Sequence, residues 1–292
     1  IRSGEVGAAL LAANTLPRNA NSNPLGRPIG IQLYAVNSAM QENPAGTLKQ
    51  LREIGFGEVE TAGFGKRSAK EFRKLLDDAG LACPSAHLQF DVDNLGPTFE
   101  DAHALGVQYV TSGGLRSGLR PPITGLASGM NLDEAKRTAA LANQIGDKAR
   151  QAGLQYAYHN HAVEFADQGG AIGYDVLLRE TNPDLVKVEI DCGWMVVGGR
   201  NPIDYFKKYP NRFPMIHVKD FLPPHDKGAD GGNASAHPGA ELGHGIIDYK
   251  PIFAAAEKAG LQHYFAEQEG PFARMSQLQA AQQAYAYLHP IS

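Results

Sequence analysis

The chain has 292 residues, of which 43% are hydrophobic and 20% are charged. This is the composition of an ordinary globular protein with enough apolar residues for a large core. A formal net charge of −4 and a pI near 6.2 provide no basic surface of the kind that binds nucleic acid. Two cysteines, Cys83 and Cys192, are too few for a disulfide framework or a thiolate zinc cluster. No apolar run approaches the ~20 residues that cross a bilayer, so we expect neither a nucleic-acid nor a membrane partner.

The first residues differ in composition from the rest of the chain. The run 6–13, Val-Gly-Ala-Ala-Leu-Leu-Ala-Ala, resembles the end of the hydrophobic region of a secretory signal, and the polar residues 14–27 follow it. The alternative is a short segment that covers the bottom of the fold, which the acidic Glu5 favours. The first interpretation places the protein in the periplasm and the second is compatible with the cytoplasm. We therefore treat 1–27 as an N-terminal extension and 28–292 as one domain.

From Pro28 onward, short β-like runs alternate with amphipathic helical runs, which is the signature of βαβ units and a parallel sheet. The eight predicted strands are 29–34, 58–62, 82–90, 107–112, 155–161, 185–191, 213–219 and 263–269. The predicted helices are 45–54, 68–79, 97–105, 132–152, 173–180, a short one from Pro202, 249–259 and 272–288. This count favours one closed (β/α)8 TIM barrel over a doubly wound sheet. Such a sheet would have fewer strands and a glycine-rich phosphate turn, which the chain lacks.

Two long segments lack helical or strand periodicity. Residues 113–130 are rich in Gly and Pro and are expected to form an extended loop at the top of the barrel. Residues 221–243 are rich in Gly, Pro, Asp and His. A loop of that length in a compact domain usually has a function or is disordered, and we expect it to lie as a lid over the C-terminal face.

The strand predicted over 185–191 shows most clearly how the barrel would place its chemistry. Its residues alternate with a period of two, so successive side chains point to opposite faces. The aliphatic face consists of Val186, Val188 and Ile190, and the charged face of Lys187, Glu189 and Asp191. An aliphatic face can pack on helices while the other face points into a barrel, towards the mouth where the active site lies.

The same alternation, applied to every strand, gives an inner face with many polar residues near the C-terminal strand ends. These residues are Gln32, Tyr34, Glu60, His87, His159, His161, Asp191, His217, Lys219 and Glu267. So many ionisable groups at one small mouth are costly without a counter-ion, and a divalent cation would balance them. Histidine and carboxylate ligands together favour Mn, Zn, Co or Fe over Ca, and Mg stays open.

Several short motifs occur in an order that resembles the sugar phosphate isomerase/epimerase family. They are His-Asn-His-x-x-Glu-Phe at 159–165, Ile-Asp-x-Gly-Trp at 190–194, Ile-His-Val-Lys-Asp at 216–220, Leu-Gly-x-Gly-Ile at 242–246 and Glu-Gln-Glu at 267–269. That family has xylose isomerase-like barrels and is related to apurinic endonucleases and ketose 3-epimerases. The resemblance runs from about Pro28 to Tyr287. It implies one divalent metal ion held by one group from each of the last four strands: His159, Asp191, His217 and Glu267.

The chain departs from two of the related groups. The ketose 3-epimerases have a glutamate at the ligand position of the fifth strand, where this chain has His159, with Glu164 as the alternative ligand five residues later. A pair of opposed glutamates for two-base epimerisation is therefore in question. The apurinic endonucleases need a further histidine three residues after Asp191, and this chain has Trp194 there. We therefore do not expect a nuclease.

The inward residues that are not assigned as ligands suggest roles in proton transfer. His161 lies on the same face as His159 and is a candidate base, together with Glu164. Lys219 would bind a substrate oxygen or stabilise a developing enolate; the alternative is a salt bridge to Glu189 or Asp220. Two residues deeper than the predicted ligand Asp191, Glu189 is expected to be a buried charge partner of the site.

Other residues suggest roles in substrate binding. Gln32, Glu60 and His87 are predicted to bind substrate hydroxyl groups. Trp194 would provide an apolar floor for the CH face of a sugar, or would simply pack under the lid. Glu267 is a candidate for proton transfer as well as a predicted ligand.

The chemistry that these residues and the resemblance imply is proton abstraction next to a carbonyl group, through an enediolate. We expect a divalent-metal-dependent sugar isomerase or epimerase with a small carbohydrate substrate. A keto-sugar lyase or dehydratase, for example on a 3-keto-glycoside, shares the same intermediate and is the alternative. A sugar-binding barrel without catalysis is the second alternative, and the intact set of predicted ligands argues against it. The sequence leaves open whether the protein is a homo-oligomer.

Overall fold

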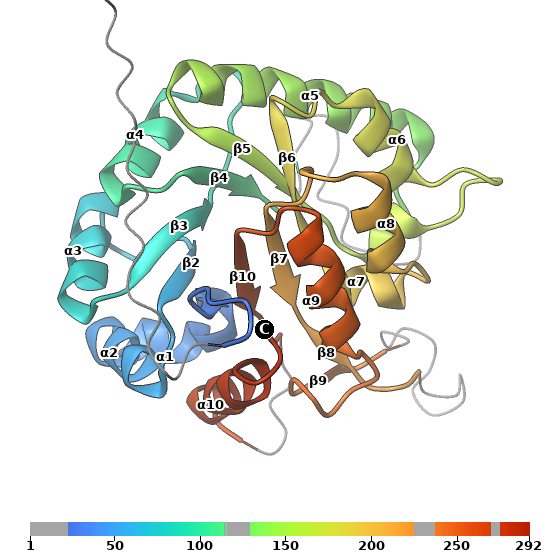
Figure 1. Ribbon diagram of the computed structural model, residues 1–292. Coiled ribbons are helices and arrows are strands. Elements are labelled where there is room, and N and C mark those ends of the chain that lie inside the picture. The colour runs from blue at the N-terminus through green and yellow to red at the C-terminus, as the bar shows by residue number, and fades with distance from the viewer. Residues whose placement is uncertain (1–22, 114, 116–128, 225–236, 270–274) are drawn as a thin grey trace, which may run out of the picture.

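The computed structural model describes residues 23–113, 115, 129–224, 237–269 and 275–292. Eight parallel strands close into a barrel, and helices surround it (Figure 1). The strands are β1 Gly30–Gln32, β2 Glu58–Ala62, β3 Ala82–His87, β4 Tyr109–Ser112, β5 Gln155–His159, β6 Val186–Asp191, β7 Met215–Val218 and β10 His263–Ala266. β10 pairs with both β7 and β1 and so closes the barrel. The predicted (β/α)8 fold is confirmed.

The helices of the described residues include all the predicted ones and two that were not predicted, at 37–42 and 192–197. In chain order, the helices are α1 Asn37–Glu42, α2 Pro44–Ile54, α3 Ala69–Ala79, α4 Gly96–Leu105, α5 Leu132–Gln151, α6 Gly173–Glu180, α7 Cys192–Val197, α8 Pro202–Lys208, α9 Tyr249–Lys258 and α10 Gln277–Leu288, with the short 3-10 helices η1 Leu33–Val36 and η2 Ala162–Phe165. Local sequence sets many of their ends. Ser68 and Glu71 form a capping box at the start of α3, and Gly80 ends that helix with a left-handed φ of 70°.

Five of the predicted strands extend beyond the observed C-terminal ends, by one to three residues. The chain turns into η1 directly after Gln32, and β5 stops at His159, shortly before η2; β3 likewise stops at His87. Alternation of polar and apolar residues continues past the last hydrogen bond of the ladder, so the pattern does not mark where a strand ends. Tyr34 and His161 therefore lie beyond the strands, at the mouth of the barrel.

Helix α7 was not predicted. Its residues 192–197 are apolar or glycine throughout, so they show no polar helical face. The helix begins because the Oδ1 atom of Asp191 accepts a hydrogen bond from the backbone N–H of Trp194 at 2.7 Å. A carboxylate in this N-cap position accepts a hydrogen bond from a backbone N–H group of the first turn, which has no acceptor within the helix.

The interior of the barrel is divided into an apolar layer and a polar layer. Tyr109, Ala157, Met215 and Phe265, from four different strands, form a separate buried cluster. The cluster members Ala157, Met215 and Phe265 are each followed, two residues later in the sequence, by a polar residue. These polar residues are His159, His217 and Glu267. The apolar layer therefore closes the barrel beneath the polar groups, as in other barrels of this architecture.

The segment predicted as a lid begins and ends in a small antiparallel pair. β8 Asp220–Phe221 pairs with β9 Gly239–Ala240. The carboxylate of Asp220 accepts hydrogen bonds from the backbone N–H groups of Phe221, Gly243, Gly245 and Ile247. This explains the Leu-Gly-x-Gly-Ile motif, because a Cβ atom at Gly245 would lie 2.1 Å from Asp220 Oδ1. Residues 225–236 lie outside the described part of the chain.

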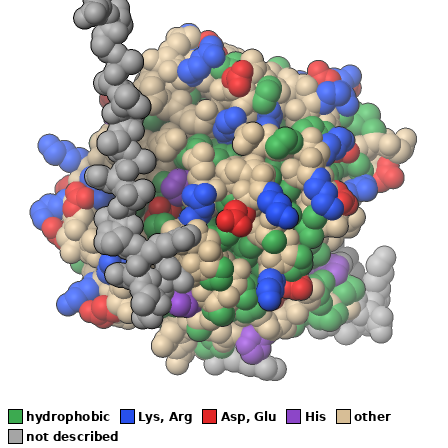
Figure 2. Space-filling model, in the orientation of Figure 1, with side chains coloured by type: hydrophobic (Ala, Val, Ile, Leu, Met, Phe, Trp, Pro, Cys, Tyr) green, Lys and Arg blue, Asp and Glu red, His purple; other side chains and the backbone are tan. Residues whose placement is uncertain are grey.

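The N-terminal end of the described chain contacts the bottom of the barrel, where the Asn23 side chain donates a hydrogen bond to the Tyr264 hydroxyl at 3.2 Å. The rest of the predicted extension, 1–22, falls outside the described residues. On the face shown in Figure 2, Lys and Arg side chains are interspersed with Asp and Glu and form no continuous basic band. Among the described helices, none combines the length and the apolar character needed to cross a membrane.

Candidate metal centre and active site

Four side chains converge at the C-terminal ends of β5, β6, β7 and β10. They are His159, Asp191, His217 and Glu267, the four residues that the family resemblance implies as metal ligands. Each offers one ligand atom, and these atoms all lie within 4.8 Å of one another. All four residues are buried. We call these four residues the upper group.

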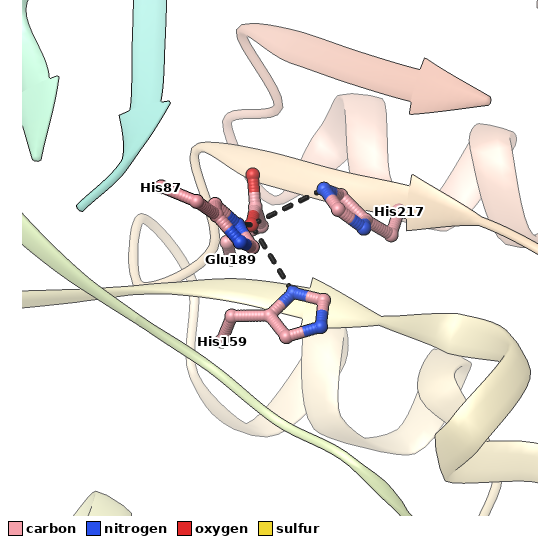
Figure 3. Close-up of side chains that lie close together, drawn as sticks. All are labelled: His87, His159, Glu189 and His217. Carbon is pink, nitrogen blue, oxygen red and sulfur yellow. Dashed lines mark hydrogen bonds and ion pairs between the residues drawn. The ribbon is translucent and has the colours of Figure 1, made fainter. Parts of the chain in front are cut away.

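A second set of potential ligands overlaps the first and lies deeper in the barrel. It consists of His87, His159, Glu189 and His217 (Figure 3). The Oε2 atom of Glu189 lies 2.8 Å from His87 Nε2, 3.1 Å from His159 Nδ1 and 3.2 Å from His217 Nε2. We call these four residues the lower group. Glu189 is thus a buried charge partner of three histidines, in the role expected of it.

The two histidines shared by the groups are electrostatically different. Burial lowers the pKa of His159, and the neighbouring His217 lowers it further. Burial alone would also lower the pKa of His217, but Glu189 and Glu267 outweigh it and raise the pKa well above the ordinary range. Of these two histidines, His217 is therefore the one whose charged form is favoured.

The upper group fits a divalent ion. The Oδ2 atom of Asp191 is buried and has no hydrogen-bond partner among the described residues, although Lys219 Nζ lies 3.4 Å away. A buried carboxylate oxygen without a hydrogen bond is costly, and a cation would satisfy it. Burial raises the pKa of Asp191 to about 6, against the effect of Lys219. Two histidines with two carboxylates form a donor set that suits zinc, manganese, cobalt or iron.

Asn160 fixes the backbone that carries Asp191. Its Nδ2 atom donates to the Asp191 carbonyl oxygen at 3.2 Å, and its Oδ1 atom accepts from the Asp191 N–H at 3.1 Å. Asn160 is fully buried. The sequence analysis assigned no role to Asn160. Its position between two inward histidines puts it on the apolar side of the strand, where a polar side chain needs a hydrogen-bond partner. This was the signal that the sequence contained.

A cavity of about 290 Å³ opens beside the upper group. It is lined by Gln32, Tyr34, Ala62, His87, Gly113, His159, His161, Glu267 and Glu269. Its volume is at the lower end of the range for small-molecule sites, about 300–1,000 Å³. Of the predicted substrate-binding residues, the structure places Gln32 and His87 in this lining.

Lys219 is a buried cation that contacts two cavity-lining residues, Glu267 and Glu269, but does not itself line the cavity. Its Nζ atom lies 2.5 Å from Glu269 Oε1, 2.9 Å from Glu267 Oε2 and 3.4 Å from Asp191 Oδ2. Burial would lower the pKa of Lys219, but these carboxylates raise it, so the ammonium form is favoured. Neither Glu189 nor Asp220, its alternative partners in the sequence analysis, contacts it in a salt bridge.

Glu269 was not predicted as a site residue. It lines the cavity and pairs with Lys219, and its side chain is 40% exposed. The signal was present in the sequence, because Glu269 follows Glu267 by two residues and so lies on the same face of an extended chain.

His161 is an uncharged imidazole in the lining of the cavity. Burial lowers its pKa to about 4, and the positive charge of Lys219 contributes to the same effect. Its ring lies edge-on to that of His159, with the centroids 5.0 Å apart. The imidazole is therefore unprotonated near neutral pH, which is the form that a general base needs.

Glu164 does not lie where the sequence analysis placed it. Its Oε1 atom accepts from the Tyr158 hydroxyl at 2.8 Å, and its Oε2 atom accepts from the backbone N–H of His161 at 2.9 Å. It belongs to neither ligand group and does not line the cavity. Burial raises its pKa to about 7. Because the chain turns into η2 after His161, this carboxylate points back onto β5, and we no longer treat it as a ligand or a base.

Glu60 and Trp194 also differ from their predicted roles in substrate binding. Glu60 is fully buried, and its oxygens accept from Gln32, Ser85 and His217, so none is left for a substrate hydroxyl. Trp194 packs on Phe221 with ring centroids 4.8 Å apart and is not part of the cavity lining. The alternative prediction for Trp194, packing under the segment after β7, agrees with this contact.

Two of the solved structures similar to this chain illustrate its fold. A sugar phosphate isomerase/epimerase from Parabacteroides distasonis superposes with a TM-score of 0.73 over 97% of this chain and 98% of its own, at 22% sequence identity. The IolI protein, solved with a bound zinc atom, superposes with a TM-score of 0.65 over 89% of this chain and 96% of its own, at 14% identity. At these identities the likeness concerns the fold.

Similarity in sequence is found to inosose dehydratases. The protein of that name from Lacticaseibacillus casei is 31% identical over 163 residues, which are 53% of this chain and 54% of the relative. The chain thus spans about half the length of the curated relatives it matches. The model of the xylose isomerase-like TIM barrel family matches residues 48–289, which include every residue of the upper and lower groups. The chain belongs to the xylose isomerase-like TIM barrel family.

Proposed function

We propose that this protein is a divalent-metal-dependent enzyme that removes a proton next to the carbonyl group of a sugar or cyclic keto-polyol. The observation that carries the proposal is the convergence of the upper group beside a cavity that an uncharged His161 also lines. His159, Asp191, His217 and Glu267 would hold the ion. When bound, it would polarise the substrate carbonyl and stabilise the negative charge that develops on its oxygen.

Side chains of the protein would provide the base, the stabilisation of negative charge and the binding of the substrate. His161 is the base that takes the proton from carbon, because its unprotonated imidazole lines the cavity. The ammonium group of Lys219, which its carboxylate partners keep protonated, would stabilise negative charge on the substrate. Gln32 and His87 would orient the substrate through its hydroxyl groups.

Loss of water is the outcome that we favour. It requires one base, because the proton that His161 takes from carbon can be returned to the departing hydroxyl group, which leaves as water. The second carboxylate base of a two-base epimerase is not provided by Glu164, which is hydrogen-bonded away from the cavity. The similarity to proteins named inosose dehydratase supports the same outcome.

Isomerisation or epimerisation is the second candidate. Glu267 belongs to the upper group and also lines the cavity. It could therefore return a proton to the neighbouring carbon or to the opposite face of the same carbon. The fold neighbour named sugar phosphate isomerase/epimerase is compatible with this outcome.

A second hollow next to the cavity bears on the size of the substrate. It has a volume of about 680 Å³ and shares Ala62 with the first cavity. Its walls include Met40, Phe64, Lys66 and Arg67. An apolar wall with two cations could accept a second group attached to the sugar. This supports a substrate larger than a free monosaccharide, such as a 3-keto-glycoside.

The test begins with metal analysis of the protein as purified and continues with proton–deuterium exchange. The panel would contain an inosose, free keto-sugars and 3-keto-glycosides, and nuclear magnetic resonance would detect deuterium at carbon and any loss of water. We expect one ion per chain and exchange that disappears in Asp191→Ala. Metal binding and sugar binding without exchange would instead identify a binding barrel without catalysis.

A further inference from the structure

His159 and His217 belong to both the upper and the lower group. Each ring points one nitrogen towards the upper group and the other nitrogen towards the lower group. The Nδ1 atom of His159 lies 3.1 Å from Glu189 Oε2, and Figure 3 shows its other ring nitrogen pointing away from that carboxylate. His217 is arranged the other way round. Its Nδ1 atom lies 2.9 Å from Glu267 in the upper group, and its Nε2 atom lies 2.8 Å from Glu60 and 3.2 Å from Glu189.

A neutral imidazole has one protonated nitrogen and one lone pair. It can therefore serve the upper group or the lower group, but not both at once. If an ion occupies the upper group, Nε2 of His159 and Nδ1 of His217 must carry the lone pairs. The protons are then on Nδ1 of His159 and Nε2 of His217, which face Glu189 and Glu60. An ionised carboxylate can only accept hydrogen bonds, so these two glutamates favour that arrangement.

Glu60 is held in place independently of any ion, whereas the side chain of Glu189 pairs only with the histidines of the lower group and its Oε1 atom has no partner among the described residues. Glu60 accepts from the Gln32 amide at 2.7 Å and from the Ser85 hydroxyl. Gln32 in turn accepts from the Tyr34 N–H at 3.1 Å, which fixes the orientation of its amide. Glu189 sits on β6 two residues before Asp191, and both side chains are fully buried. One strand thus supplies a ligand of the upper group and the carboxylate beneath it.

We infer that Glu60 and Glu189 are positioning residues that select one tautomer of each shared histidine, so that a single ion binds in the upper group. His159 coordinates it through Nε2 and His217 through Nδ1. The lower group takes no second ion, because the nitrogens that its two shared histidines, His159 and His217, turn towards it are protonated when the upper group is filled. This inference rests on the metal dependence proposed above.

The direct test needs no substitution. Protein labelled with ¹⁵N at histidine would be loaded with zinc, and long-range ¹H–¹⁵N spectra would identify the nitrogen of each ring that binds the metal. We expect zinc at Nε2 of His159 and at Nδ1 of His217, with one equivalent bound. Zinc at Nδ1 of His159, or a second equivalent bound by the lower group, would overturn the inference.

Substitution tests the two glutamates themselves. Glu189→Gln and Glu60→Gln keep the size and an acceptor oxygen but remove the charge, and each is expected to weaken zinc binding about 10–100-fold in a chelator competition. Glu58→Gln is the matched control, because Glu58 pairs with His263 Nδ1 at 2.8 Å at the other end of the barrel. Its zinc affinity should equal that of the parent.

The outcomes separate this inference from the proposed function. A parent protein that binds no zinc would overturn both. A parent that binds one zinc ion and catalyses exchange, but coordinates it through the opposite nitrogens, would overturn only the selection of tautomers. Zinc affinity that stays within twofold of the parent in both Glu189→Gln and Glu60→Gln would have the same consequence.

Discussion

The side chain of Asn160 pairs with the backbone of Asp191 as a neighbouring strand residue would, with one hydrogen bond in each direction. β5 ends at His159, and the ladder between β5 and β6 ends at His159 and Glu189. The amide of Asn160 therefore continues the pairing of the two strands by one step. The position of the Asp191 carboxylate then depends on a side chain that touches neither the cavity nor any predicted ligand atom.

Replacement of Asn160 should accordingly affect the metal centre. Asn160→Leu removes both hydrogen bonds and leaves the buried N–H and C=O of Asp191 without partners. We expect a loss of about 1–3 kcal/mol in the free energy of unfolding and metal affinity that is about 10–100-fold lower. Urea denaturation and chelator competition would measure the two effects.

Asn143 provides the matched control for this prediction. Its amide also forms one hydrogen bond in each direction with the backbone, to Glu180 and Asn182 at the end of α6. Asn143→Leu should lower stability by about 1 kcal/mol and leave metal affinity unchanged. Equal loss of metal affinity in both variants would show that Asn160 acts only through general stability.

Replacement of His161 should separate proton transfer from metal binding. We expect His161→Ala to keep one ion per chain and to lower the rate of deuterium exchange by about 10²–10⁴-fold, the usual contribution of a general base. His103→Ala, on the surface helix α4, is the control and should change neither quantity. Full exchange in His161→Ala would move the base function to Glu267 or Glu269.

Lys219→Met keeps the length of the side chain and removes its charge. If Lys219 stabilises charge in the transition state, kcat should fall while KM changes little. If it only binds the ground state, KM should rise instead. Metal content should be kept, because the substitution removes a positive charge 3.4 Å from Asp191 Oδ2. Steady-state kinetics and metal analysis together distinguish these outcomes.

The buried Glu164 should make stability depend on pH. Its pKa rises from 4.5 to about 7 on folding, so the folded protein binds this proton more tightly than the unfolded chain. The resulting stabilisation is complete below about pH 4.5 and is lost as the pH rises through 7. The difference corresponds to about 3 kcal/mol.

Glu164→Gln should remove this contribution. The free energy of unfolding of the variant should fall less between pH 5 and pH 8 than that of the parent, by roughly the same amount. Glu53→Gln, on the exposed side of α2, is the control and should follow the parent. Parallel pH profiles for Glu164→Gln and the parent would show that Glu164 stays ionised in the fold.

Ala62 lies where the two cavities meet, so a large side chain there should separate them. We expect Ala62→Trp to lower kcat/KM for a 3-keto-glycoside by at least tenfold more than for a free keto-sugar. Ala254→Trp, on the exposed face of α9, should change neither. A uniform loss for both substrates would indicate that the larger hollow does not hold part of the substrate.

The period of two along each strand was enough to predict the barrel and the inward face of each strand. It placed His159, Asp191, His217 and Glu267 among ten inward residues, the family resemblance then implied that these four are ligands, and the structure brings their ligand atoms together. The alternation does not predict how deep within the barrel an inward side chain lies. Glu60 and Glu267 both face inward, but Glu267 lines the cavity, whereas Glu60 is fully buried and does not.

The alternation also stops predicting the direction of a side chain where the strand ends. The spacing between His159 and Glu164 allowed either to be a ligand, since the path of the chain after β5 was unknown. The turn into η2 directs Glu164 towards Tyr158 instead. Asn160 escaped assignment as a functional residue for a related reason: its role depends on a partner from β6, which only the assembled barrel defines.

The antiparallel pair of β8 and β9 has a consequence for protein engineering. Leu222 and Pro238 are joined by a backbone hydrogen bond of 2.8 Å, and Asp220 ties the returning chain to the end of β7. The chain therefore leaves and re-enters the barrel at one point, so the length of the intervening sequence is not dictated by the barrel. A fluorescent domain inserted there would report on events near Lys219 without interrupting the strand that carries His217.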